Sequence, residues 1–291
     1  METLIGKYLG GVLGISFIFS SFVACGTGLY KVSVKDDFDT AKTAAASPSS
    51  VDKTSTLYGI HATAGWQKLP IPFRFDPTLR EDQKIELMSA MKRWEWATGK
   101  TIFSFDGDHK GVTGDSFKDL YSSLADGING NYLDTNWEKT AKPDYVLATT
   151  IWTNGSDASS VVKADLRFNN EYYVIGDSFE VKAEGKKEVV DMQSLALHEL
   201  GHLLGLGHVD EDVDSLSIMN PTLFIGEGLT TRKLSKSDIE RIQQIYGCTG
   251  GACDVDGLIK EQDEKNWDNL FLTAKQWVDS GSKMSPPLKL H

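Results

Sequence analysis

The stretch from His198 to His208, HELGHLLGLGH, constrains this chain most, because it holds three of the six histidines. His198 and His202 are four residues apart, so on an α-helix their rings lie on one face, one turn apart. Two imidazoles at this spacing can bind one zinc ion. Gly205 then lets the chain turn sharply, which brings back His208 as a third ligand. The stretch therefore predicts a helix that ends in a tight glycine turn.

Glu199 lies between the two helical histidines in the sequence but points elsewhere. One residue along a helix is a rotation of about 100°, so Glu199 borders the metal without binding it and can accept a proton from a water molecule. Three neutral imidazoles leave a fourth zinc position for that water, as in catalytic rather than structural zinc sites. We therefore expect His198, His202 and His208 as zinc ligands and Glu199 as a general base.

The charge of the chain excludes one class of partner. Its 291 residues contain 30 Lys and Arg against 41 Asp and Glu, which gives a net charge of −11. A nucleic-acid-binding protein needs a basic face to neutralise phosphates, so we expect no nucleic-acid partner. We expect a monomer.

Residues 1–25 have the features of an export signal. Lys7 precedes the largely apolar run from Tyr8 to Ala24, which is short for a membrane-spanning helix and is typical of a secretory signal. The run ends in FVAC, and small residues before a cysteine resemble the lipobox of bacterial lipoproteins. Cys25 would then carry a lipid that holds the exported protein to a membrane of the cell envelope. An ordinary cleaved signal and an uncleaved anchor are the alternatives.

Residues 26–57 include TAKTAAASPSSVDKTST, which is small, polar and without apolar periodicity, and which predicts a flexible tether. A pro-segment whose Asp36 reaches the metal is the alternative. Residues 58–247 form the predicted catalytic domain, and residues 248–291 form a C-terminal extension. In that extension, Trp267 to Trp277 has the apolar spacing of one amphipathic helix.

Cys248 and Cys253 stand in CTGGAC, with two glycines between them. Two close cysteines in an exported chain predict a small disulfide loop. Two free thiols are the alternative, and a metal site has less support because no other cysteine or histidine is near.

Apolar periodicity and turn residues predict the elements of the domain. We expect strands in IPFRFDP, KTIFSF, DYVLATTIW and SVVKADLRF, a long irregular insertion over 106–143, and helices over 80–98, from Asp191 through the histidine motif, and from Ser235 to Gly247.

Met219 lies eleven residues after His208, in SIMNP, and with it the chain resembles a metzincin, in which a methionine turn packs beneath the zinc. Within that group, residues 58–247 resemble the matrixins, the matrix-metalloproteinase-like family. VLATTIW is similar to the strand at the rim of the matrixin cleft, ADLRFNNE to the strand and acidic turn that follow, and LSKSDIERIQQIYG to the terminal helix.

The resemblance implies an α+β fold, with a twisted, mostly parallel sheet, an antiparallel edge strand, an active-site helix and a C-terminal helix. It implies a zinc endopeptidase that acts on extended proteins or peptides, which would pair with the edge strand near Leu147 and Ala148. Pro221 and Leu223 would line the pocket for the residue after the scissile bond, although matrixins often have a tyrosine at Leu223. A binding or adhesion module that keeps the fold without turnover is the rival, and the intact Glu199 argues against it.

The chain also departs from the matrixin pattern. Thr149 and Arg167 stand near the places of histidines that bind a second, structural zinc, so we do not expect that zinc. Asn169 and Asn170 replace carboxylates of a calcium turn and leave only Glu171, so calcium binding there stays open. The cysteine-switch motif PRCGxPD is absent from the sequence.

Overall fold

The computed structural model describes residues 30–33, 52–264 and 279. Its centre is a six-stranded sheet in the order β2–β7–β5–β3–β4, and these five strands run parallel. The sixth strand, β6, lies off this path and pairs antiparallel with β7. The strands are β2 (Gly65–Trp66), β3 (Ile71–Phe75), β4 (Phe103–Asp108), β5 (Gly130–Asp134), β6 (Ala148–Asn154) and β7 (Ser160–Asn169).

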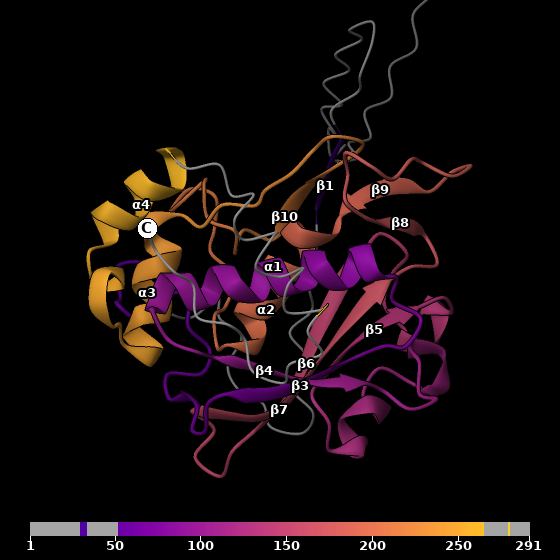
Figure 1. Ribbon diagram of the computed structural model, residues 1–291, viewed down its shortest axis with the longest axis horizontal. Coiled ribbons are helices and arrows are strands. Elements are labelled where there is room, and N and C mark those ends of the chain that lie inside the picture. The colour runs from indigo at the N-terminus through magenta and orange to yellow at the C-terminus, as the bar shows by residue number, and fades with distance from the viewer. Residues whose placement is uncertain (1–29, 34–51, 265–278, 280–291) are drawn as a thin grey trace, which may run out of the picture.

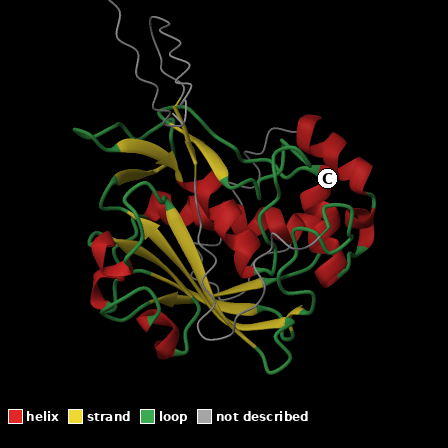
Figure 2. Ribbon diagram, turned by 180° about the vertical axis from the view of Figure 1, so that it is seen from behind, coloured by secondary structure: helices red, strands yellow, loops and turns green. Residues whose placement is uncertain are grey.

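Two helices, α1 (Glu81–Thr98) and α2 (Met192–Leu203), pack against each other, and α2 also contacts β6 and β7. Figure 1 shows α1 crossing in front of α2, with the sheet below both. Helix α1 ends at Gly99, whose φ of 69° is left-handed and therefore favours glycine. Helix α2 begins at Asp191, whose carboxylate accepts a hydrogen bond from the Ser194 N–H. The helices thus form a second layer on the sheet, as the view from behind shows (Figure 2).

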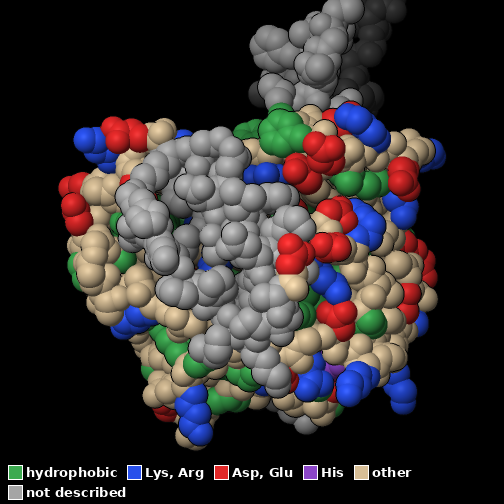
Figure 3. Space-filling model, viewed as in Figure 1, with side chains coloured by type: hydrophobic (Ala, Val, Ile, Leu, Met, Phe, Trp, Pro, Cys, Tyr) green, Lys and Arg blue, Asp and Glu red, His purple; other side chains and the backbone are tan. Residues whose placement is uncertain are grey.

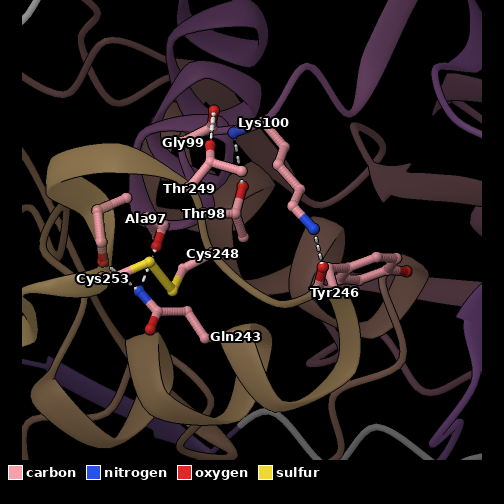
Figure 4. Close-up of a disulfide and its surroundings, with 10 residues drawn as sticks. Ala97, Thr98, Gly99, Lys100, Gln243, Tyr246, Cys248, Thr249 and Cys253 are labelled. Carbon is pink, nitrogen blue, oxygen red and sulfur yellow. Dashed lines mark hydrogen bonds between the residues drawn. A yellow bond between two sulfur atoms is a disulfide. The ribbon is translucent and has the colours of Figure 1, made fainter.

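The C-terminal part of the described chain packs on the end of α1. Helix α3 (Lys236–Tyr246) is capped by Ser235, and α4 (Val255–Glu264) packs on α3. A disulfide joins Cys248 to Cys253, and the Gln243 side chain beside it donates hydrogen bonds to the carbonyl oxygens of Ala97 and Ala252, both at 2.7 Å (Figure 4). Residues 248–264 therefore dock on the domain. The predicted helix near Trp267 to Trp277 lies outside the described residues.

Two short strand pairs border the helices on the side away from the large sheet. In one, β8 (Tyr173–Gly176) pairs parallel with β9 (Glu188–Asp191). In the other, β10 (Thr222–Ile225) pairs antiparallel with β1 (Tyr30–Ser33), from Tyr30 opposite Ile225 to Ser33 opposite Thr222. Strand β1 belongs to the segment for which a flexible tether was predicted, so four residues of that segment are extended and paired. Short 3-10 helices are η2 (Gly114–Ser116), η3 (Ser122–Asp126), η4 (Trp137–Thr140) and η5 (Gly250–Cys253).

The α+β fold with a mostly parallel sheet and an antiparallel edge strand is confirmed. The irregular insertion predicted over 106–143 was wrong for β5, which lies between β3 and β7 in the sheet. All five β5 residues are buried, so the strand has no alternation of polar and apolar positions by which to recognise it.

Among the described residues, no helix is both long enough and apolar enough to cross a membrane. On the face drawn in Figure 3, basic and acidic side chains are interspersed.

Candidate metal centre

The three histidines of the motif converge on one point. The His202 Nε2 atom lies 3.0 Å from His198 Nε2 and 3.2 Å from His208 Nε2. Zinc–nitrogen bonds of about 2.0–2.1 Å in a tetrahedral site place two ligand nitrogens roughly 3.3 Å apart. The residues present therefore fit a tetrahedral zinc ion with three histidine ligands. His198 and His202 are buried and His208 is partly exposed, which leaves the centre open on the His208 side.

The opposite ring nitrogens of two ligands contact backbone carbonyl groups. His198 Nδ1 lies 2.7 Å from the Ile218 oxygen, and His202 Nδ1 lies 2.9 Å from the Leu206 oxygen. Because a carbonyl oxygen only accepts, each Nδ1 carries the hydrogen and each Nε2 keeps its lone pair for a metal. The protein thus fixes both the orientation and the tautomer of these two rings.

Gly205 makes the turn that returns His208 to the helix. Its φ is 107°, and a Cβ built there would lie 2.8 Å from the Ala62 carbonyl oxygen, so no other residue fits without displacing the backbone. The Gly205 oxygen accepts hydrogen bonds from the N–H groups of His61 and Ala62. The segment that precedes β2 therefore stabilises the glycine turn through two hydrogen bonds.

The turn containing Met219 is tied to helix α3 by Asp238, which is fully buried. One Asp238 oxygen accepts from the Ser217 hydroxyl at 2.5 Å, and the other accepts from the N–H groups of Ile218 and Ser235, both at 2.9 Å. Ile218 presents its carbonyl to His198 in turn. Asp238 thus positions His198 through one residue, Ile218.

Met219 is fully buried beneath the histidine helix. A Cβ built on Gly201, between the two helical histidines, would lie 2.3 Å from the Met219 sulfur and 3.2 Å from a ring carbon of Trp94. The helix can approach the methionine this closely only because position 201 has no side chain.

Glu199 is buried and lies under the edge strand of the sheet. The Thr150 hydroxyl, on β6, donates to Glu199 Oε2 at 2.5 Å. Thr150 thereby holds the Glu199 carboxylate against β6, a role that the sequence analysis missed. Sequence spacing gave no signal for it, because the two residues are 49 positions apart.

Strand β6 has one paired edge and one edge without a strand partner among the described residues. The Leu147 carbonyl oxygen accepts from the Asn169 N–H at 2.9 Å, so that atom faces β7. Carbonyl directions alternate along a strand, so the Ala148 carbonyl faces the other edge. Of the two predicted substrate-pairing residues, Ala148 therefore offers its carbonyl to a peptide, whereas the carbonyl of Leu147 is already used.

Pro221 and Leu223 lie in the segment that follows the methionine turn, Leu223 within β10. Leu223 is 5% exposed and Pro221 is partly exposed. Arg232, farther along, donates to the Asp191 carboxylate at 2.9 Å and pairs with Asp177 at 2.9 Å. Its guanidinium is thus bound at the start of α2, and this anchoring role was not predicted from the sequence.

A comparison with protein-family models matches residues 65–247 to the model described as Matrixin. The chain belongs to the matrixin family. Curated relatives include Metalloendoproteinase 5-MMP of Arabidopsis thaliana, 50% identical over 20% of this chain and 15% of that protein. Metalloendoproteinase 1 of Glycine max is 39% identical over 54% of this chain and 53% of that protein. The matched part of this matrixin therefore spans about half, or less, of the length of each of these relatives.

A likeness to the solved structure of high choriolytic enzyme 1, a hatching enzyme zinc-protease of the medaka fish Oryzias latipes, is slight. Its TM-score is 0.32 at 16% identity, over 64% of this chain and 96% of that chain. It supports no argument about this matrixin.

The departures from the family pattern have structural counterparts in this matrixin. The buried Arg167 guanidinium pairs with the buried Asp134 carboxylate at 2.8 Å and donates to the Leu120 carbonyl at 3.0 Å. Burial raises the pKa of Asp134 to about 6, although Arg167 opposes that shift. Glu171 accepts from the Trp137 N–H. An ion pair and direct hydrogen bonds thus connect these residues to the neighbouring loops.

Gly201→Ala should destabilise the protein by about 1–3 kcal/mol, because the added methyl group overlaps the Met219 sulfur in a closely packed site. Urea unfolding at constant m-value would measure the loss. Gly251→Ala is the matched control, since a Cβ there meets nothing within 4 Å. Equal stability of the two variants would contradict the proposed packing of helix and methionine turn.

Proposed function

We propose that this matrixin is a zinc-dependent endopeptidase that hydrolyses extended protein or peptide substrates. The observation that carries the proposal is the convergence of the side-chain nitrogens of His198, His202 and His208 at the helix that also bears Glu199, whose carboxylate is hydrogen-bonded to Thr150 on the edge strand β6. His198, His202 and His208 would hold the zinc. When bound, zinc polarises the substrate carbonyl and lowers the pKa of a water molecule to about 7.

The residues of the chain supply the remaining functions. A peptide that pairs with the open edge of β6 is held extended, and the Ala148 carbonyl is available to fix its register. The Glu199 carboxylate, oriented by the Thr150 hydroxyl, accepts the proton of the attacking water and returns it to the leaving amine as the peptide bond breaks. No protein side chain is needed as a nucleophile, so no acyl-enzyme forms.

The decisive experiment replaces Glu199 by Gln. The purified protein should contain about one zinc per chain by elemental analysis, and the variant should retain it, because Glu199 is not a ligand. The variant should lose at least about a hundredfold in kcat/KM on peptides, because the proton acceptor is gone. If the unaltered protein binds zinc but cleaves no member of a diverse peptide library, the non-catalytic binding module is the better interpretation.

The pocket for the residue after the scissile bond should be apolar. Its proposed wall contains Pro221 and Leu223, which bring no charge, and Arg232 is bound to Asp191. Burial of a leucine-sized side chain contributes roughly 1.5–3 kcal/mol, whereas a buried charge would lack a partner. Sequencing of the library products should therefore show Leu or Ile above Asp or Lys at this position. A preference for charged residues there would refute this placement of the wall.

We further propose that the protein is exported and held to a membrane of the cell envelope by a lipid on Cys25, which lies outside the described residues. The support is the FVAC ending of the apolar run. Mass spectrometry of the mature protein should find a lipid-modified cysteine at its N-terminus, and Cys25→Ser should release the protein from the membrane fraction. A mature N-terminus elsewhere would exclude this anchor.

A further inference from the structure

A hollow of about 260 Å³ lies where the start of β6, the β8–β9 pair and the end of β10 meet. Tyr145 lies three residues before β6, Tyr173 begins β8, and Ile225 ends β10. The hollow therefore adjoins β6 and β10, the two strands that border the proposed cleft. The function proposed above does not use it.

The distance from the metal centre fixes which part of a substrate reaches the hollow. Thr150 marks the catalytic position on β6, because its hydroxyl binds Glu199. Tyr145 is five residues earlier, which is at most about 16 Å at the rise of an extended strand, because the chain turns at Asp144 and Tyr145, where the Val146 N–H donates to the Pro143 carbonyl oxygen. On the opposite side, Ile225 is two residues beyond Leu223 in β10. A peptide lying antiparallel to β6 would thus bring its third to fifth residue after the scissile bond to the hollow.

The lining is aromatic and net negative. Tyr145 is 45% exposed, and Tyr172 and Tyr173 are partly exposed, so their rings are accessible from the hollow. Its charged lining residues are two carboxylates, Asp144 and Glu188, and one ammonium group, Lys186. Burial, with Asp144 and Glu188, raises the pKa of the Tyr173 hydroxyl to about 12. The pKa of Tyr172 is raised first by Glu171, then by burial, Glu138 and Asp144. The negative potential of the carboxylates therefore acts on both rings.

The hollow is also held in shape before any ligand binds. Asn169, at the end of β7, donates from its side chain to the carbonyl oxygens of Asp144 at 3.0 Å and Val146 at 2.8 Å. Tyr173 and Glu188 stand opposite each other in the β8–β9 ladder. A site built on strands and a fixed turn loses little conformational entropy on binding.

We propose that this hollow binds a cationic side chain, arginine or lysine, of the substrate, three to five residues beyond the scissile bond. Tyrosine faces attract a cation, and the two carboxylates complete its environment, with arginine favoured because its planar group also stacks on aromatic rings. The proposal rests on the endopeptidase function and adds a second determinant of substrate choice, distinct from the apolar pocket next to the metal.

The test uses the full mature protein and peptides that differ only in one residue, Arg, Ala or Glu, moved through the second to sixth positions after the scissile bond. Arginine at the third, fourth or fifth position should raise kcat/KM about three- to tenfold over alanine. Glutamate should lower it, and both effects should weaken as salt is added, because surface charges are screened. A flat profile across all five positions would overturn the proposal.

Variants assign the preference to the hollow. The double variant Asp144→Asn/Glu188→Gln removes both charges and keeps the shapes, and it should abolish the arginine preference while cleavage of the alanine peptide persists. Tyr145→Ala should reduce the preference, and Lys186→Gln should increase it. The matched control is Asp256→Asn/Glu264→Gln, on exposed α4 carboxylates that pair with other lysines, and it should leave the preference unchanged. An arginine preference that survives loss of Asp144 and Glu188 would contradict the site.

Equilibrium binding separates this proposal from the function on which it rests. Fluorescence anisotropy of the same peptides on Glu199→Gln should show the same order, arginine above alanine above glutamate. If no peptide is cleaved but this order holds, the endopeptidase function fails and the cationic subsite stands. If peptides are cleaved but neither cleavage nor binding favours arginine, the subsite fails alone.

Discussion

The buried carboxylate of Asp238 connects helix α3 to the candidate metal centre. It accepts hydrogen bonds from Ser217, Ile218 and Ser235, so one side chain closes both the methionine turn and the start of α3. Burial raises the pKa of this group, and its hydrogen bonds offset part of that cost. Because the Ile218 carbonyl orients the His198 ring on α2, the position of that ring depends on Asp238 of α3. Helix α3 thus helps to shape the candidate site, although none of the three histidines lies on it.

Local signals were sufficient to predict the elements on which the site is built. Asp191 and Ser235 cap their helices, Gly99 ends α1 in the left-handed conformation, and the spacing from His198 to His208 predicts one face and one turn. These signals act within a few residues of chain. For that reason they can be recognised in the sequence without knowledge of the tertiary structure.

The features that were missed depend on neighbours distant in the sequence. Strand β5 is buried on both faces and lies among glycines and aspartates, so its own residues resemble a loop. Thr150 reaches Glu199 across 49 positions, and Asp238 reaches Ser217 across 21. Arg167 was read only as the loss of a histidine, whereas in the fold it forms a buried ion pair with Asp134. The sequence shows that a histidine of the family pattern is missing at this place, but the ion pair that Arg167 forms depends on a partner 33 positions away.

The pairing of β1 with β10 limits the distance between β10, in the proposed wall of the cleft, and the proposed lipid anchor at Cys25. Tyr30 lies five positions after Cys25, and five residue steps span at most about 18 Å. If Cys25 carries the proposed lipid, β10, which pairs with β1, is held within about that distance of the membrane surface. Encounter would then depend on the local concentration of chains at the membrane surface rather than on affinity for free peptides. The proposed endopeptidase activity and the proposed lipid anchor would together favour substrates at the same membrane surface over substrates in solution.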